Sequence, residues 1–512
     1  MPLSCGRYGE HLSKEQVAEL VAPSPDGLNL VSAWLEHHGV PPSTISTKHG
    51  GSWLILTGVP VSRANNLLEA SYQLYQHIGT NMTVLRTLSY GLPEALISYV
   101  QTVAPSTHFG FPHTSWQKPR MRRDGDGAAA TRSKVPVGEL GTALSSRDQP
   151  ARVTPDFLRW LYRTSAYVPT AARWNVVGIV GSLNDYPSPD DLRIFMNEYR
   201  SDAISATYTV VGVNGGGYNP NNPAYEPNLN IEYAEAMAFP ATHIFYSIGI
   251  NLGDPLITWL EYVLDRVTVP QTISSSYGSD EYAVPPDYAI HVCNLFAQLG
   301  ARGASLLFAS GDGGVGTGNC LLKDGFGNTF VRFLPTFPST CPCVILILLA
   351  NSSQALEKVT HNATHTFTGS WVTSVGGTTG YNPEVAASIS GGGFSAYFPQ
   401  PLYQSRAVPA FLQNLGGQYY GLYKCVPYCE QTRLALTCCD LYSPRGRGIP
   451  DISLQAMGFA LVSKRQPWLM DGTSCAAPVR SFLPRLLSSL VLRPRAPCLL
   501  PTYRPQRASF PC

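Results

Sequence analysis

Charged residues and long hydrophobic runs are both scarce in this 512-residue chain. Asp, Glu, Lys and Arg together make up 14% of the residues, and the formal net charge at pH 7 is +2. A chain so close to neutrality lacks the basic surface that attracts nucleic acids or anionic membranes. The longest apolar run covers residues 344 to 350, which is far too short to span a bilayer. We therefore expect neither a nucleic-acid nor a membrane partner.

A secretory signal and a zinc-binding pattern are also missing. Residues 1 to 6 lead straight into a polar segment without the apolar stretch of a signal peptide, so we interpret the N-terminus as truncated. Cysteines 425, 429, 438 and 439 have a spacing that fits no zinc template. Cys320 and Cys341 flank a short glycine-containing loop, and they could pair in an oxidising compartment.

The most informative feature that is present is a Gly-Thr-Ser motif at residues 472 to 474, followed by small residues and Pro478. Such a motif places the Ser474 hydroxyl at the mouth of a buried helix, whose N-terminal N–H groups favour a developing anion. The two His-Gly pairs, at 38–39 and 49–50, lie far upstream, and neither is followed by threonine. A histidine-dependent serine peptidase of the subtilisin type is therefore excluded, and another group must take the serine proton.

The first 150 residues divide into a small α+β unit and a linker. Residues 13 to 16 form a capping box that opens a helix, and a strand over 52–56 and a helix over 62–75 follow. Residues 116 to 150 are basic and have no apolar periodicity, which is typical of an exposed linker. An exposed linker between two folded units is a favourable place for proteolytic cleavage.

Strand-like and helix-like segments alternate at short spacing from residue 151 onward. This alternation predicts a parallel sheet with helices on both faces. We expect strands over 176–180, 207–213, 243–248, 272–276 and 305–309, and helices over 189–199, 226–237, 255–266 and 287–299.

Three polar sites lie where these strands end or these helices begin. Pro227 fixes a helix start, and the four-residue spacing puts Glu226 and Asn230 on one face of that helix. Asp312 follows the strand that ends at residue 309, at the carboxyl edge where active sites of such sheets lie. Ser474 is the third site.

With these residues in place, the chain resembles the sedolisins (serine-carboxyl peptidases), and most of all their secreted fungal tripeptidyl-peptidases. The resemblance implies a subtilisin-like α/β fold with an activation prodomain at 1–115, a linker with the activation cleavage at 116–150, and a peptidase domain at 151–479. The matching segments occur in the family's order: the helix at 226–231, then 274–278, 308–312, 335–338, 373–378, 390–395, 448–451 and 472–474.

The resemblance also implies a role for each polar site. Ser474 would be the nucleophile, Glu226 its general base, Asp312 the oxyanion-hole acid, and Asn230 would stand where the family has a second aspartate. A glutamate near its reference pKa of about 4.3 and a protonated aspartate both predict an acid optimum. We expect a secreted, acid-acting peptidase that releases tripeptides from free N-termini of peptides and proteins, with its own prodomain as inhibitor.

The chain departs from the family at several places, which leaves an alternative open. Segments near 344–370 and 425–443 interrupt family motifs, and we interpret them as translated introns. The tail at 480–512 is atypical, and no Asp or Glu follows Asp471, so the family's calcium ion is predicted not to bind. The alternative is a catalytically impaired sedolisin-like pseudo-peptidase, or a product that does not fold.

Overall fold

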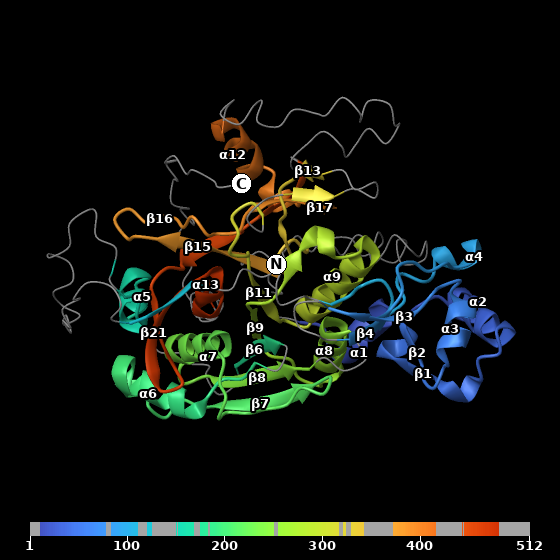
Figure 1. Ribbon diagram of the computed structural model, residues 1–512, viewed down its shortest axis with the longest axis horizontal. Coiled ribbons are helices and arrows are strands. Elements are labelled where there is room, and N and C mark those ends of the chain that lie inside the picture. Colours follow the sequence, from blue (N-terminus) through green and yellow to red (C-terminus); the bar gives the residue numbers. More distant parts are fainter. Residues whose placement is uncertain are drawn as a thin grey trace.

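The computed structural model describes the following residues: 11–77, 83–110, 120–124, 150, 152–167, 175–182, 185–249, 254–316, 321–323, 329–342, 372–415, 443 and 445–480. The interruptions predicted near 344–370 and 425–443, the tail after residue 480, and most of the predicted linker lie outside these residues. Within them the chain forms a large α/β unit, with a smaller N-terminal unit, residues 11–110, beside it (Figure 1).

An eight-stranded sheet forms the centre of the large unit, in the order β16-β15-β11-β9-β6-β8-β7, with β19 also paired to β15. Its ladders are parallel except for β16, which runs antiparallel to β15. The strands are β6 (Val176–Ser182), β7 (Tyr208–Val213), β8 (Thr242–Ile248), β9 (Thr272–Ser275), β11 (Ser305–Ala309), β15 (Val372–Thr379), β16 (Val385–Ala386) and β19 (Ile452–Gln455).

Helices cover both faces of this sheet, as the alternating sequence pattern predicts (Figure 1). On one face lie α5 (Pro155–Leu161), α6 (Pro189–Tyr199), α7 (Tyr225–Ala238) and α13 (Thr473–Arg480); on the other lie α8 (Pro255–Asp265) and α9 (Pro286–Ala301). The strands and helices predicted between residues 176 and 309 are all present, with ends shifted by at most two residues.

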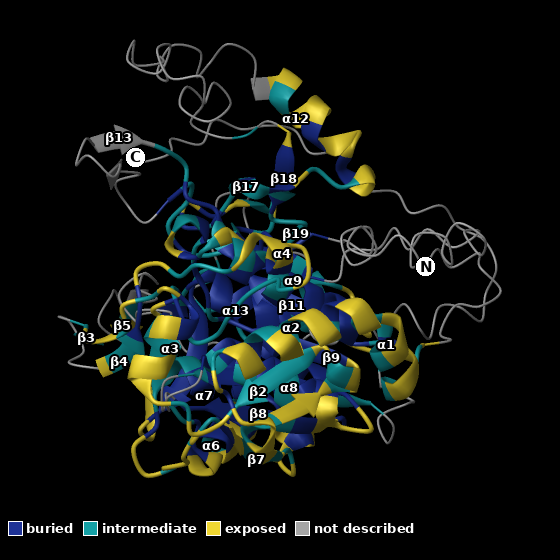
Figure 2. Cartoon of the chain, turned by 90° about the vertical axis from the view of Figure 1, so that its right-hand side faces the viewer, coloured by how far each residue is buried: buried dark blue, intermediate teal, exposed yellow. Residues whose placement is uncertain are grey.

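Alternating side chains of the strands supply the two hydrophobic cores. In β11, Leu307 joins the core under α7 and α13, whereas Leu306 and Phe308 join the core under α8 and α9. Because successive residues of a strand point to opposite faces, a strand buried on both sides reads as a continuous apolar run. Figure 2 shows that α13 and β11 lie in the buried interior, whereas α1 and α2 carry exposed surface.

Shorter elements surround the central sheet. They are β5 (Arg120–Arg123), β10 (Ser279–Asp280), β12 (Leu321–Lys323), β13 (Thr329–Val331), β14 (Thr336–Phe337), β17 (Gly393–Pro399), β18 (Gly446–Ile449), β20 (Phe459–Ser463), β21 (Gln466–Asp471), α12 (Ala407–Leu415) and the 3₁₀ turns Ser201–Ala203, Glu281–Ala283 and Leu402–Gln404.

The N-terminal unit is α+β, as predicted, but one of its helices is shorter than expected. Helix α1 opens with the predicted capping box at Ser13, whereas the helix expected over 62–75 ends at Leu67 and residues 73–76 form a strand. The elements are α1 (Lys14–Leu20), α2 (Pro25–His37), α3 (Val61–Leu67), α4 (Glu94–Ile97), β1 (Ile45–Lys48), β2 (Trp53–Leu56), β3 (Gln73–Gln76), β4 (Thr83–Arg86) and the 3₁₀ turns Pro42–Thr44 and His49–Gly51.

Four residues of the predicted linker are structured. Strand β5 pairs antiparallel with β21, with Arg120 opposite Asp471, and extends the β20–β21 hairpin to three strands. Asp124, just after it, makes an ion pair with Arg152 (2.8 Å). Pairing with a β-hairpin stabilises residues 120–123 as a strand although they lack hydrophobic periodicity of their own, and the linker over 116–150 with its activation cleavage stays a prediction.

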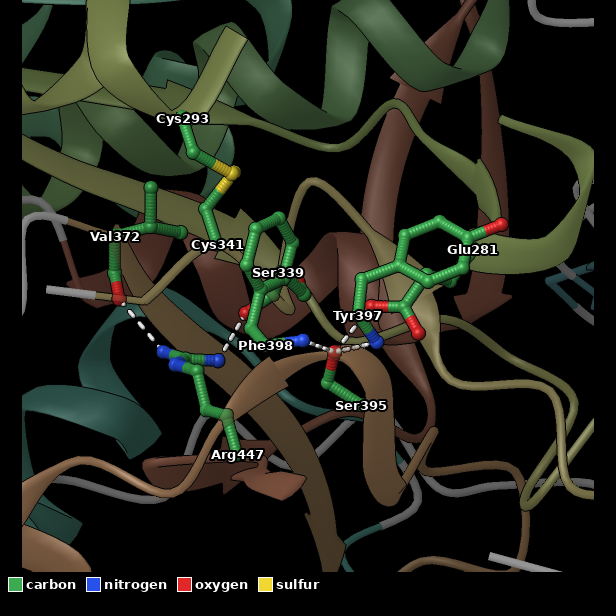
Figure 3. The surroundings of a disulfide bond; sticks show 9 residues. All are labelled: Glu281, Cys293, Ser339, Cys341, Val372, Ser395, Tyr397, Phe398 and Arg447. Carbon is green, nitrogen blue, oxygen red and sulfur yellow. Dashed lines mark hydrogen bonds between the residues drawn. A yellow bond between two sulfur atoms is a disulfide. The ribbon is translucent and has the colours of Figure 1, made fainter. Parts of the chain in front are cut away.

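The expected disulfide has a different partner. Cys341 is bonded to Cys293 on α9, across a Cα–Cα distance of 5.3 Å, and Cys320 lies outside the described residues. Cys320 and Cys341 are near each other in the sequence, whereas the fold brings α9, which carries Cys293, against the segment after β14, which carries Cys341 (Figure 3). A disulfide between two buried cysteines is typical of a protein made in an oxidising compartment.

Ion pairs between the N-terminal unit and α8 all have the carboxylate on or next to α8. Lys14 pairs with Asp265 (2.6 Å) and Lys48 with Glu261 (3.4 Å), both with exposed lysines. The third pair is buried: His108 Nδ1 lies 2.7 Å from Asp254 Oδ2. Burial raises the pKa of Asp254, but the His108 imidazole and the hydrogen bonds to this carboxyl bring it below its ordinary value.

Replacing His108 with glutamine is expected to weaken docking of the N-terminal unit, because Asp254 stays buried without its imidazole partner. The loss should be about 1.5–3 kcal/mol, as for a hydrogen bond to a charged group. Lys48→Gln is the control, because the Lys48 side chain is half exposed and its 3.4 Å contact with Glu261 is long, so that this pair should contribute less, about 1 kcal/mol. Hydrogen exchange of residues 11–110 measures the difference, and equal exchange in the two variants would contradict it.

Among the described residues, the structure contains no helix long and apolar enough to cross a membrane.

Candidate active site

Ser474 lies at the start of α13, a buried helix of small residues. The helix packs between α7 and the strands β15, β11 and β19, and residues 473–479 are all buried in it. Ala476 and Ala477 are fully buried, so larger side chains there would push α13 away from the sheet. The Ser474 Oγ atom is buried and has no hydrogen-bond partner within the described part of the chain.

Glu226 and Asn230 lie one turn apart on α7, as their spacing predicts. Asn230 Nδ2 donates to Glu226 Oε1 at 3.4 Å, which is a long hydrogen bond. Asn230 Oδ1 accepts from the Ser276 hydroxyl at 3.1 Å, and the same hydroxyl lies 3.5 Å from the backbone oxygen of Ser474. The amide at position 230 is therefore held between the carboxylate and the residue after β9.

Asp312 follows β11 and reaches the first residue of α13. Its Oδ1 atom accepts two hydrogen bonds from Thr473, one from the backbone N–H (2.6 Å) and one from the hydroxyl (2.8 Å). Its Oδ2 atom is buried and has no hydrogen-bond partner within the described ranges. Strand β11 and helix α13 thus place Asp312 beside the residue that precedes Ser474.

Both carboxyl groups have raised pKa values. Removal from water raises the pKa of Glu226 to about 8; the nearby Ser474 hydroxyl, the Asn230 amide and the Ser276 hydroxyl oppose this shift, and the Asp312 charge adds to it. Removal from water also raises the pKa of Asp312 to about 6, although both Thr473 hydrogen bonds oppose it. Since Ser474 affects the pKa of Glu226, its hydroxyl lies near that carboxyl even though no hydrogen bond within 3.5 Å joins them.

The sequence argument took Glu226 at an ordinary pKa of about 4.3, and the structure differs on this point. Enclosure by α7, β9 and α13 removes water from the Glu226 carboxyl and raises its pKa. Sequence periodicity does not predict this enclosure. Ser276 and Thr473 were not predicted as neighbours of the carboxyl groups. They lie inside segments 274–278 and 472–474, which carry the family resemblance, and this position could have indicated that they belong to the site.

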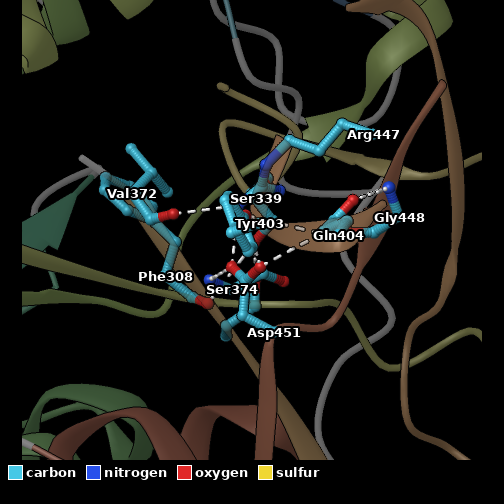
Figure 4. A network of polar contacts seen from close by, with 10 residues as sticks. Phe308, Ser339, Val372, Ser374, Tyr403, Gln404, Arg447, Gly448 and Asp451 are labelled. Carbon is cyan, nitrogen blue, oxygen red and sulfur yellow. Dashed lines mark hydrogen bonds and ion pairs between the residues drawn. The ribbon is translucent and has the colours of Figure 1, made fainter. Parts of the chain in front are cut away.

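Other segments of that resemblance have a structural role. Asp451 accepts from the Ser374 backbone N–H (2.8 Å), from buried Arg447 (2.7 Å) and from the Tyr403 hydroxyl (2.8 Å) (Figure 4). Arg447 also donates to the backbone oxygens of Ser339 and Val372, next to the disulfide (Figure 3). These contacts join segments 335–342, 372–378 and 446–451. We therefore assign Arg447 and Asp451 a structural role.

Calcium, which the family resemblance implies, finds no fitting ligand set among the residues described. No group of three or more His, Cys, Asp or Glu side chains within them could hold a metal ion. That calcium does not bind stays a prediction from the sequence, which has no Asp or Glu after Asp471.

The known proteins that resemble this chain in sequence are tripeptidyl-peptidases. Residues 3–109 match the model of the pro-kumamolisin activation domain. The chain is 31% identical to the probable tripeptidyl-peptidase SED3 of Trichophyton verrucosum over 96% of its own length and 75% of the relative's. The corresponding protein of Arthroderma benhamiae is also 31% identical, and the tripeptidyl-peptidase SED3 of Arthroderma otae 30%, with the same coverage. With this identity over almost its whole length, the chain belongs to the sedolisin family of serine peptidases.

Proposed function

We propose that the chain is a tripeptidyl-peptidase in which Ser474 is the nucleophile, Glu226 the general base and Asp312 the oxyanion acid. The observation that carries the proposal is the convergence of these three side chains from α13, α7 and the end of β11. The relatives are named tripeptidyl-peptidases, which supports release of tripeptides, and the family resemblance implies that these come from free N-termini of peptides and proteins.

In the first half of the reaction, Ser474 Oγ attacks the carbonyl carbon of the third residue and its proton passes to Glu226. The carbonyl oxygen becomes an oxyanion, which accepts a hydrogen bond from protonated Asp312. When the intermediate collapses, the C–N bond breaks and Glu226 returns the proton to the leaving amine. Water then attacks the acyl-serine, with Glu226 again taking the proton, and the tripeptide leaves with a new carboxyl group.

This mechanism needs one proton on the pair formed by Glu226 and Asp312. Activity should fall at low pH as the pair takes a second proton and at high pH as it loses the last one. Burial raises the pKa of Asp312 to about 6 and that of Glu226 to about 8, so the limits should fall near these values, and the active form, with Glu226 charged and Asp312 neutral, is the minor one-proton form of the free enzyme. The Ser474 hydroxyl already opposes the raised pKa of Glu226, so a substrate complex in which it donates to this carboxylate at hydrogen-bond distance should work at more acid pH.

We further propose that the chain acts outside the cell and that the N-terminal unit restrains it until the linker is cut. The buried disulfide supports the first statement, and the docking of residues 11–110 on α8 and α9 supports the second. The test is hydrolysis of an unblocked tripeptide reporter before and after linker cleavage. No hydrolysis above that of a Ser474→Ala variant in either form would favour the pseudo-peptidase alternative.

Replacing Asn230 with aspartate, the family's residue, is expected to raise the rate and to move the profile toward less acid pH. The present amide donates a long hydrogen bond to Glu226 but cannot share the proton that Glu226 receives. It favours the charged form of Glu226, which lowers the pKa of this group and keeps the pH profile of the parent more acid. The pH–rate profiles of parent and variant decide this, and identical profiles would contradict it.

A further inference from the structure

The two oxygens of Asp312 have different surroundings. Oδ1 accepts the backbone N–H and the hydroxyl of Thr473, at 2.6 and 2.8 Å. Oδ2 is buried and meets no hydrogen-bonding atom in the part of the chain that the structure describes. The whole side chain is only 9% exposed, and Thr473 is completely buried. The carboxyl group is therefore anchored through one oxygen and leaves the other for a ligand.

This asymmetry decides where a neutral carboxyl carries its proton. A proton on Oδ1 would point against one of the two hydrogens that Thr473 already directs there. A proton on Oδ2 meets no such conflict and turns this oxygen into a donor. The same oxygen is the one that remains available to a developing oxyanion, which needs donors already in place.

The direction of the Thr473 hydroxyl is itself fixed. Its oxygen accepts the backbone N–H of Gly311 at 3.2 Å, so its single proton is left to donate to Asp312. Gly311 directly precedes Asp312, and Thr473 directly precedes Ser474. The Thr473 hydroxyl thus links the segment that contains Asp312 to the segment that contains Ser474.

We propose that Thr473 is a positioning residue that places the proton of Asp312 on Oδ2 and holds this oxygen at a set distance from Ser474. Thr473 touches no reacting atom in this arrangement and acts through Asp312. The inference rests on the proposed function only where the Asp312 proton is donated to the oxyanion of the substrate. The placement of the proton itself follows from the contacts of the free protein.

The test compares Thr473→Val, which removes the hydroxyl but keeps the branched shape, with Thr473→Ser, which keeps the hydroxyl. Valine should lower kcat about tenfold or more, up to the roughly 10²- to 10³-fold that a lost oxyanion donor costs, with little change in KM. It also removes a bond that favours charged Asp312, so the lower pH limit of activity, which follows the Asp312 pKa of about 6, should rise. Serine should recover most of kcat and bring that limit back.

A second measurement needs no activity. Titration of the Asp312 carboxyl by carbon-13 NMR in the full chain carrying Ser474→Ala should give a higher pKa with valine than with serine at 473. Equal values in two folded variants would overturn the inference, as would a valine variant with the parent's kcat and pH limits. A higher value with valine, together with a parent chain that hydrolyses no reporter, would support the proton placement and contradict the proposed function instead.

Discussion

Replacing Ser474 with alanine is expected to lower kcat/KM for an unblocked tripeptide reporter by about 10⁴-fold or more. A peptidase that loses its nucleophile keeps only what binding and oxyanion stabilisation provide. The change should leave the fold intact, because the Ser474 hydroxyl makes no hydrogen bond within the described residues and alanine suits a helix. Reporter hydrolysis and the thermal unfolding midpoint, measured on the same preparation, check both parts.

The unfolding midpoint separates chemistry from folding in this experiment. A large loss of activity with an unchanged midpoint identifies Ser474 as a reacting group. Ala477→Ser is the control for folding. It adds a hydroxyl to the same buried helix, where little space is left against the sheet, so this variant should lower the unfolding midpoint. If alanine at 474 retained most of the parent's activity, another residue would have to be the nucleophile.

Glu226→Gln is expected to lower kcat/KM by about 10²- to 10⁴-fold, which is the usual contribution of a general base. Glutamine has nearly the same shape but cannot take the Ser474 proton. The pH profile should also change in form. With Glu226 neutral at all pH values, the low-pH limit disappears and the remaining activity falls only where Asp312 loses its proton, with a pKa of about 6.

Glu198→Gln on the exposed side of α6 is the matched control, because it removes a carboxylate from a helix on the same face of the sheet. It should keep the parent's rate and both pH limits. A Glu226→Gln variant that kept both limits as well would show that Glu226 is not one of the titrating groups. The role of base would then pass to another residue.

Sequence periodicity was sufficient to predict β6, β7, β8, β9 and β11 of the central sheet, because these strands are short apolar runs separated by helices with clear start signals; β15, β16 and β19 were not predicted. Ser188 and Asp254 each cap a helix whose first residue is proline, and both helices begin where the sequence predicts. The N-terminal unit was harder, since the turn after Leu67 precedes a strand of mostly exposed residues. The sequence of β5 contains no strand signal of its own, because this strand is stabilised by its pairing with β21.

The identities of the site residues were predictable, but their electrostatics were not. The four-residue spacing of Glu226 and Asn230 and the strand end before Asp312 are local features. The pKa values depend on how α7, α13 and the loops after β9 and β11 enclose the carboxyl groups. The disulfide partner of Cys341 depends in the same way on the packing of α9, 48 residues away in the sequence.

The most direct test of a carboxyl pair that works with one proton is the pH dependence of kcat/KM, measured after linker cleavage. Two reporters should be compared, a tripeptide with a free amino group and the same tripeptide with an acylated one. We expect a profile that falls on both sides for the free reporter, its upper limit no higher than about pH 8, and little hydrolysis of the acylated one. A rate that does not change with pH, or that does not exceed the Ser474→Ala background at any pH, would contradict the account.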